Sequence, residues 1–224
     1  MFGPFIINLQ WLVLAVSGML GYFVIWLRLK GVELFKKVVT ETIFDSLVII
    51  SLVWKLSLIL FHPVKFITNP MTLIYFSGGT RGFLLGLAIA AAYLFYFSRK
   101  QGVSVWIYAD LIVSGALAAT MSYSLIAMMS SKELLLYYGS RSLLAALLLL
   151  WQVKKLRGLG KIENLIQLLM WYILGEIFIF NLKAEEVSSY NLILGFSLKQ
   201  IIFYALAIVS IGSNLIFGKK RNNL

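Results

Sequence analysis

The sequence predicts an all-α fold, a polytopic membrane helix bundle of about seven transmembrane helices in a single domain over residues 1–224. Three observations support this prediction. Of the 224 residues, 61% are hydrophobic and only 13% are charged, whereas a soluble domain carries about 25% charged residues. Seven apolar stretches are long enough to cross a bilayer, at about 20 residues per span. Lys and Arg collect in alternate connections between these stretches, as the positive-inside rule requires.

The predicted spans follow one another with short connections. We expect them at 5–27, 42–61, 82–98, 105–130, 136–153, 163–182 and 196–217. The first has no charged residue and lacks the basic start of a cleavable signal peptide, so it is interpreted as a retained anchor. The fifth is interrupted at its start by Gly139, Ser140 and Arg141. The longest connection, 62–81, is expected to be an outward-facing or re-entrant loop.

The basic residues orient the predicted bundle. Of the 20 Lys and Arg, most lie in the first, third and fifth connections and in the tail, and fewer lie on the opposite side. The N-terminus is therefore predicted outside and the C-terminus in the cytoplasm. The segments expected in the cytoplasm are 28–41, 99–104, 154–162 and 218–224.

Composition argues against several classes of function. The low charged fraction argues against a soluble enzyme, a disordered tail or a nucleic-acid-binding module. The net charge of +11 is instead attributed to loops that face anionic lipid. The chain has no cysteine and a single histidine, His62, which excludes disulfides and Cys-ligated metals and argues against a zinc site. We expect no metal, no cofactor and no nucleic acid.

Four charged side chains fall inside predicted spans, where each costs about 2.5–3.5 kcal/mol unless it finds a cavity or a partner. They are Asp45, Lys55, Asp110 and Glu176. The first three lie near span ends and can reach an interface. Glu176 lies deep in an apolar run, so we expect it to be internal, facing the fourth or first span with a cationic or hydroxyl partner. The alternative is a protonated glutamate that hydrogen-bonds a neighbouring helix and does no chemistry.

A glycine-rich segment with an arginine, Gly78-Gly79-Thr80-Arg81-Gly82, precedes the third span. Adjacent glycines let backbone N–H groups approach a phosphate, and an arginine has the donors for a bidentate contact. A turn or a close helix contact is the alternative interpretation of the same glycines. Gly78, Gly79 and Arg81 are therefore candidate phosphate-binding residues.

Several motifs occur along the chain in a characteristic order. They are Asn69-Pro70-Met71, Gly78-Gly79, Gly82-Phe83-Leu84-Leu85-Gly86, Arg99-Lys100-x-Gly102, Ala109-Asp110-Leu111-Ile112 with Gly115, and Tyr172-x-x-x-Glu176. This order resembles that of the prolipoprotein diacylglyceryl transferases. The resemblance spans nearly the whole chain, and the topology of that family agrees with seven spans and an outside N-terminus.

The resemblance implies a function in the bacterial cytoplasmic (inner) membrane. The family moves a diacylglyceryl group from phosphatidylglycerol to the thiol of a lipobox cysteine in a lipoprotein precursor, without a cofactor. Carried over to this chain, the candidate catalytic residues are Arg81, Asp110 and Glu176. The candidate residues for binding lipid or phosphate are Gly78, Gly79, Arg81, Lys55 and Tyr172.

Most catalytic positions of the family are replaced in this chain. Arg81 stands where the family has a histidine, and Ser124 and Ala127 stand where it has an arginine and an asparagine. Tyr172 replaces a second arginine and Leu12 a tyrosine. The reaction needs cations for the departing phosphate and a group that accepts or orients the thiol proton. The sequence therefore favours a divergent member with weak or lost catalysis, whose cavity binds phospholipid, a lipoprotein signal peptide or another membrane protein.

Two other functions stay open. One is a working transferase with a site rebuilt around Arg81, Asp110 and Glu176, which their convergence in one pocket would favour. The other is an unrelated activity, such as a small transporter or a structural subunit of a membrane complex. Paired broken helices in two halves of the chain would favour a transporter, and the sequence shows no internal repeat.

Overall fold

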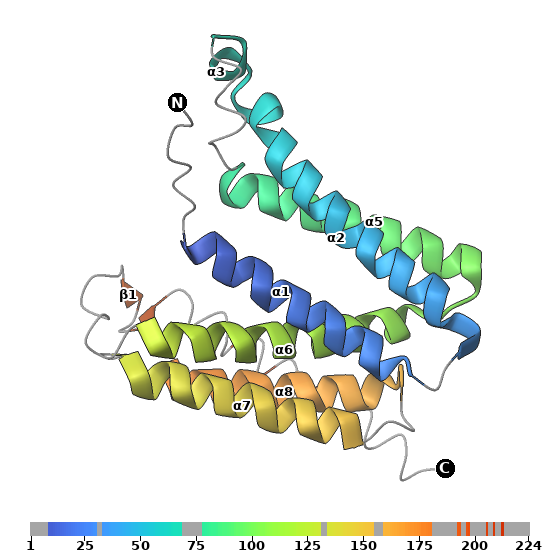
Figure 1. The fold of residues 1–224 in the computed structure, drawn as a ribbon, viewed down its shortest axis with the longest axis vertical. Helices are drawn as coiled ribbons and strands as arrows, with labels where there is room; N and C mark the ends of the chain where they lie inside the picture. Colours follow the sequence, from blue (N-terminus) through green and yellow to red (C-terminus); the bar gives the residue numbers. More distant parts are fainter. Residues whose placement is uncertain are drawn as a thin grey trace, which may run out of the picture. The chain divides into compact units, whose positions relative to one another are not determined.

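The structure is a computed structural model that describes residues 9–30, 33–68, 78–130, 134–154, 159–180, 192–193, 196–197, 205, 208 and 212. Seven helices lie within this part of the chain: α1 (Leu9–Arg28), α2 (Glu33–Phe61), α3 (Pro63–Thr68), α5 (Gly79–Gln101), α6 (Val105–Ser130), α7 (Leu135–Lys154) and α8 (Ile162–Phe180) (Figure 1). Two short strands, β1 (Leu192–Ile193) and β2 (Phe196–Ser197), pair antiparallel. The prediction of a helical fold is confirmed for the described residues.

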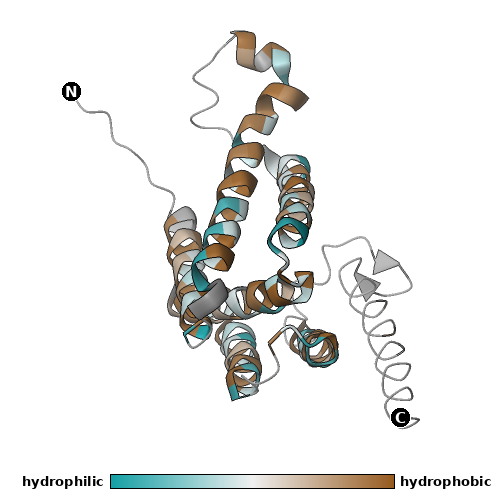
Figure 2. Cartoon of the chain, turned by 90° about the vertical axis from the view of Figure 1, so that its right-hand side faces the viewer, coloured by the Kyte–Doolittle hydropathy of each residue, from teal (hydrophilic) through white to brown (hydrophobic). Residues whose placement is uncertain are grey.

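Four of the described helices are long and apolar enough to cross a membrane. These segments are Lys36–Phe61, Gly79–Gln101, Val105–Met129 and Ile162–Phe180. Figure 2 shows hydrophobic residues along all the long helices, and many large apolar side chains are exposed, Leu84 and Phe178 among them. Such exposure suits helices whose outer faces contact lipid.

The predicted spans agree with the helices except at their edges. The fourth, 105–130, coincides with α6, and the fifth and sixth lie within two residues of α7 and α8. The second begins earlier than predicted, at Glu33, because Lys36, Lys37 and Glu41 lower the hydropathy of turns that are still helical. The third begins at Gly79 rather than at residue 82.

Two predicted segments differ from the structure or lie largely outside it. The connection 62–81 is not wholly a loop, because α3 occupies its start and α5 begins at Gly79; residues 69–77 lie outside the described residues. The seventh span, 196–217, begins in strand β2 rather than in a helix. Apart from β2 and three isolated positions, that span lies outside the described residues.

The chain divides into two compact units. Unit 1 comprises residues 1–28 and 109–224, and unit 2 comprises residues 29–108. Unit 2 is therefore inserted into unit 1 along the chain. In unit 1, a buried apolar cluster joins α6, α7 and α8 through Leu117, Ala145, Leu148 and Leu168.

Unit 2 is built on close packing between α2 and α5. Small residues recur four positions apart from the N-cap of α5 along one of its faces, at Gly78, Gly82, Gly86 and Ala90. This pattern lets two helix backbones approach. A Cβ added at Gly82 would overlap Ser57 Oγ, and one at Gly86 would lie 2.9 Å from the carbonyl oxygen of Ile50. The glycines of this segment thus have a packing role against α2.

Candidate functional site

Unit 1 holds two groups of charged side chains that lie inside the helix packing. We call Arg28, Asp110, Ser114 and Gln152 the Asp110 cluster, and Arg141 with Glu176 the Glu176 pair. The Asp110 cluster joins the end of α1, the start of α6 and the end of α7. The Glu176 pair joins the second turn of α7 to the last turns of α8.

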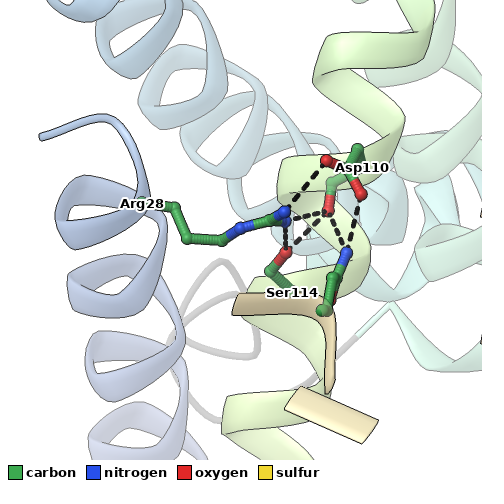
Figure 3. A network of polar contacts seen from close by, with 4 residues as sticks. Arg28, Asp110 and Ser114 are labelled. Carbon is green, nitrogen blue, oxygen red and sulfur yellow. Dashed lines mark hydrogen bonds and ion pairs between the residues drawn. The ribbon is translucent and has the colours of Figure 1, made fainter. Parts of the chain in front are cut away.

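The Asp110 cluster is a network in which every member contacts Asp110 (Figure 3). Arg28 Nη2 lies 3.2 Å from Asp110 Oδ2, and Arg28 Nη1 donates to Ser114 Oγ and, at 3.4 Å, to the carbonyl oxygen of Asp110. Gln152 Nε2 donates to Asp110 Oδ1 at 2.7 Å and to the same carbonyl at 3.2 Å. The Ser114 hydroxyl also donates to this carbonyl, at 2.7 Å.

Burial makes the Asp110 cluster a structural ion pair. All four side chains lie in residues that are at most 5% exposed. A buried charge is tolerated when it is paired, and here Arg28 and Asp110 pair with each other. Ser114 and Gln152 add hydrogen bonds to the pair, while Arg28 Nε and Gln152 Oε1 have no hydrogen-bond partner in the described residues. Asp110 therefore does not reach the membrane surface, although its position near the end of a predicted span is compatible with such a location. Arg28, assigned to a cytoplasmic connection, is buried as well.

The Glu176 pair joins α7 and α8. Arg141 Nε donates to Glu176 Oε1 at 2.8 Å, and the side chains are 28% and 6% exposed, respectively. The prediction that Glu176 is internal and has a cationic partner is confirmed. Its partner lies on the fifth predicted span, whereas the fourth or first was expected. The Arg141 side chain is the more exposed member of the pair.

Local sequence explains why the two side chains meet. Gly175, next to Glu176, faces Leu144 of α7, and a Cβ there would lie 2.6 Å from Leu144 Cδ1. The glycine thus lets α7 and α8 approach closely beside the carboxylate. Tyr137 and Tyr172 lie close enough to interact electrostatically with Arg141, and Tyr172 also packs against the apolar cluster of unit 1.

The Asp110 cluster and the Glu176 pair are separate sites. Arg141 and Gln152 share helix α7, and their separation of eleven positions corresponds to a rise of about 16 Å. Asp110 and Glu176, both predicted as catalytic candidates, therefore each have their own basic partner. The structure does not gather them around one reacting atom.

The remaining candidates lie in unit 2. Arg81 is exposed in the first turn of α5, and Lys55 is half-buried on α2. A Cβ at Gly78 would overlap Ser57 Oγ and the carbonyl oxygen of Trp54. Gly79 has a positive φ of 61°, and its carbonyl accepts a hydrogen bond from Trp54 Nε1 at 3.1 Å. Close contact with α2 thus accounts for Gly78, and the turn conformation accounts for Gly79.

Three of the positions compared with catalytic residues of the resembling family carry uncharged side chains: Ser124, Ala127 and Leu12. Ser124 is fully buried, and its hydroxyl has no hydrogen-bond partner in the described part of the chain. Ala127 is half-buried and Leu12 is 52% exposed. Among the described residues, no group of three or more His, Cys, Asp or Glu side chains is placed to hold a metal ion.

Sequence reasoning missed four members of these sites: Arg28, Ser114, Arg141 and Gln152. Arg141 did carry a signal, because it interrupts an apolar run in which an unpaired charge is costly. Arg28 carried none, since an arginine directly after an apolar span is the usual mark of a cytoplasmic loop.

No protein-family model, curated protein or solved structure compared with the chain matches it. The resemblance to the diacylglyceryl transferases stays a prediction from the motifs and their order. The geometry of the Glu176 pair is therefore the main support for a function.

Proposed function

We propose that this protein is a seven-span protein of the bacterial cytoplasmic membrane that binds an anionic phospholipid through Arg141, and that it transfers diacylglyceryl groups weakly or not at all. The observation that carries the proposal is the Glu176 pair, in which a 28% exposed arginine is held beside a 6% exposed glutamate. With the N-terminus outside, α7 begins and α8 ends at the outer side. The pair then lies in the outer half of the membrane.

The chemistry of Arg141 favours phosphate as its ligand. Glu176 contacts the Nε edge of the guanidinium, and the two terminal nitrogens carry further N–H groups. Those groups match the spacing of two phosphate oxygens and bind them by charge-assisted hydrogen bonds. Phosphatidylglycerol is the expected lipid because the resembling family uses it. A lipoprotein signal peptide and another membrane protein are the competing occupants.

The same pair accounts for weak catalysis. A thiol that approached Glu176 would compete with Arg141 for Oε1, and Asp110 is already engaged by Arg28 and Gln152. A transferase needs a group that takes or orients the thiol proton and separate cations for the leaving phosphate. Asp110 and Glu176 are instead each matched with one arginine. This arrangement supports binding better than turnover.

Lipid binding can be tested with purified protein in nanodiscs of phosphatidylcholine that contain a minor fraction of phosphatidylglycerol. We expect phosphatidylglycerol to be enriched on the unaltered protein after detergent extraction, as measured by native mass spectrometry. Arg141→Gln should abolish the enrichment, whereas Arg99→Gln, which removes an exposed arginine over the Phe95 ring, should preserve it. Equal enrichment in both variants would overturn the assignment to Arg141.

A second function, transfer by a rebuilt site, is favoured by one observation: Arg141 supplies a guanidinium close to Tyr172, where the resembling family has an arginine. Lipidation of a lipobox precursor, with phosphatidylglycerol as donor, separates the two functions. We expect less than a tenth of the rate of an active family member, a difference of about 1.4 kcal/mol in barrier. A rate within tenfold of that member would establish a working transferase.

A further inference from the structure

The point at which unit 2 is inserted coincides with the Asp110 cluster. Arg28 is the last residue of unit 1 before the chain enters unit 2, and the chain re-enters unit 1 at Ala109, inside the first turns of α6. Asp110 follows directly. Arg28, which directly precedes the inserted segment, and Asp110, the second residue after it, therefore form the buried ion pair, with Arg28 Nη2 3.2 Å from Asp110 Oδ2.

In unit 2, a different set of residues links the start of α6, the end of α5 and α2; we call Thr42, Gln101 and Tyr108 the Tyr108 cluster. Tyr108, its last residue, donates a hydrogen bond from its hydroxyl to Gln101 Oε1 at 2.9 Å, and Gln101 lies 3.5 Å from Thr42 Oγ1. Tyr108 is 1% exposed. Side chains two positions apart on α6 thus serve different units, Tyr108 in unit 2 and Asp110 in unit 1.

We propose that the Asp110 cluster is a clasp that closes unit 1 across the insertion, so that unit 1 keeps its helices assembled independently of unit 2. A chain with a long insertion loses entropy when its two ends are brought together. In a membrane, a directional, buried ion pair also sets which residues of two apolar helices face each other, as buried polar residues do in coiled coils. Gln152 extends the clasp from α1 and α6 to α7.

The clasp does not depend on lipid binding at Arg141. The Glu176 pair lies on α7 and α8, about 16 Å from Gln152 along α7. Loss of lipid binding with an intact clasp would contradict only the proposed function. A cluster that proved dispensable would contradict only the clasp.

The test is hydrogen–deuterium exchange of the full-length protein in detergent, with three variants. Arg28→Gln leaves Asp110 as an unpaired buried charge, Asp110→Asn leaves Arg28 unpaired, and the double variant removes both charges and keeps an oxygen for Gln152. We expect each single variant to lose at least tenfold protection from exchange in α1 and the start of α6, with α2 and α5 unchanged. The double variant should recover at least half of that loss on a logarithmic scale.

The matched control is Thr42→Val, which removes the contact between Thr42 and Gln101 in unit 2. It should change hydrogen–deuterium exchange in α2 and α5 but not in α1. If the single variants fail to fold, the protection of α1 in the double variant is compared with that in the Thr42→Val control. Equal loss of protection in both units, losses that simply add in the double variant, or unchanged protection of α1 in Arg28→Gln would each overturn the clasp.

Discussion

Arg141 contacts Glu176 through Nε, 2.8 Å from Oε1, and the carboxylate is the more deeply buried partner. The pair is therefore asymmetric. Removal of the arginine leaves a buried carboxylate without a cationic partner, whereas removal of the glutamate leaves an arginine that is still partly exposed. This asymmetry leads to the first prediction.

Arg141→Leu should destabilise the protein more than Glu176→Leu does. A buried charge that loses its partner costs about 3–5 kcal/mol, and Glu176 is the more buried of the two. The double variant Arg141→Leu/Glu176→Leu should recover most of the loss, because apolar replacement of a whole pair is often neutral. Thermal unfolding in detergent measures all three. Two single losses that merely add would mean that the side chains are not coupled.

Glycine replacement on α5 should separate α5 from α2. Gly86→Ala places a Cβ 2.9 Å from the backbone oxygen of Ile50, and relief of such overlap requires the helices to shift, at about 1–3 kcal/mol. Gly18→Ala on α1 is the control, because a Cβ there meets nothing within 4 Å and alanine favours the helix by about 1 kcal/mol. An unchanged unfolding temperature for Gly86→Ala, or an equal drop for Gly86→Ala and Gly18→Ala, would contradict the packing described for α5.

Ser124→Ala should leave stability unchanged or raise it by about 1 kcal/mol. The hydroxyl of Ser124 is buried without a partner in the described residues, and an unmade buried hydrogen bond carries a desolvation cost. Ser122→Ala is the contrast, since the Ser122 hydroxyl donates to the Ala118 carbonyl at 2.8 Å and its removal should bring no gain. Ser124→Arg should destabilise the protein without restoring transfer. Recovered lipidation by that variant would show that the position opens into a site.

Single cysteines can test the proposed orientation, because the natural chain contains none. A cysteine at Gly102, in the exposed turn after α5, should react with an impermeant maleimide only after the cells are opened. A cysteine at Arg81, at the other end of α5, should react in intact cells. The opposite pattern would reverse the orientation and move the Glu176 pair to the cytoplasmic half.

Hydropathy predicts the helices well because a bilayer accommodates helices whose side chains are mostly apolar, and hydropathy measures that property. It places 105–130 correctly and misses the start of α2, where Lys36, Lys37 and Glu41 lower the local average. The spacing of Gly78, Gly82 and Gly86 also carried a readable signal for a close helix contact. For the segment 78–82, a close helix contact is only an alternative interpretation of the sequence, and the contact with α2 shows that this alternative holds for Gly78 and Gly82.

The arginine that pairs with each buried carboxylate could not be predicted from the sequence. Glu176 needed a cation, but the register between α7 and α8, fixed in part by Gly175 against Leu144, decides that the cation is Arg141. Arg28 and Asp110 are 82 residues apart in sequence, and each separately resembles a charge at a span end. Their pairing depends on how α1 and α6 pack, and no local pattern encodes that packing.

The separation between Arg28 and Asp110 also has a consequence for biosynthesis. At about 5–20 residues per second, the 82 positions that separate them take roughly 4–16 s to synthesise. Throughout that time the last turn of α1 carries an arginine whose partner does not yet exist, and its charge would cost about 2.5–3.5 kcal/mol at the bilayer centre. Until α6 has been made, Arg28 is therefore more stable in water or among lipid headgroups than in the hydrocarbon core. Arg28 can reach its buried, paired position only after Asp110 has been synthesised.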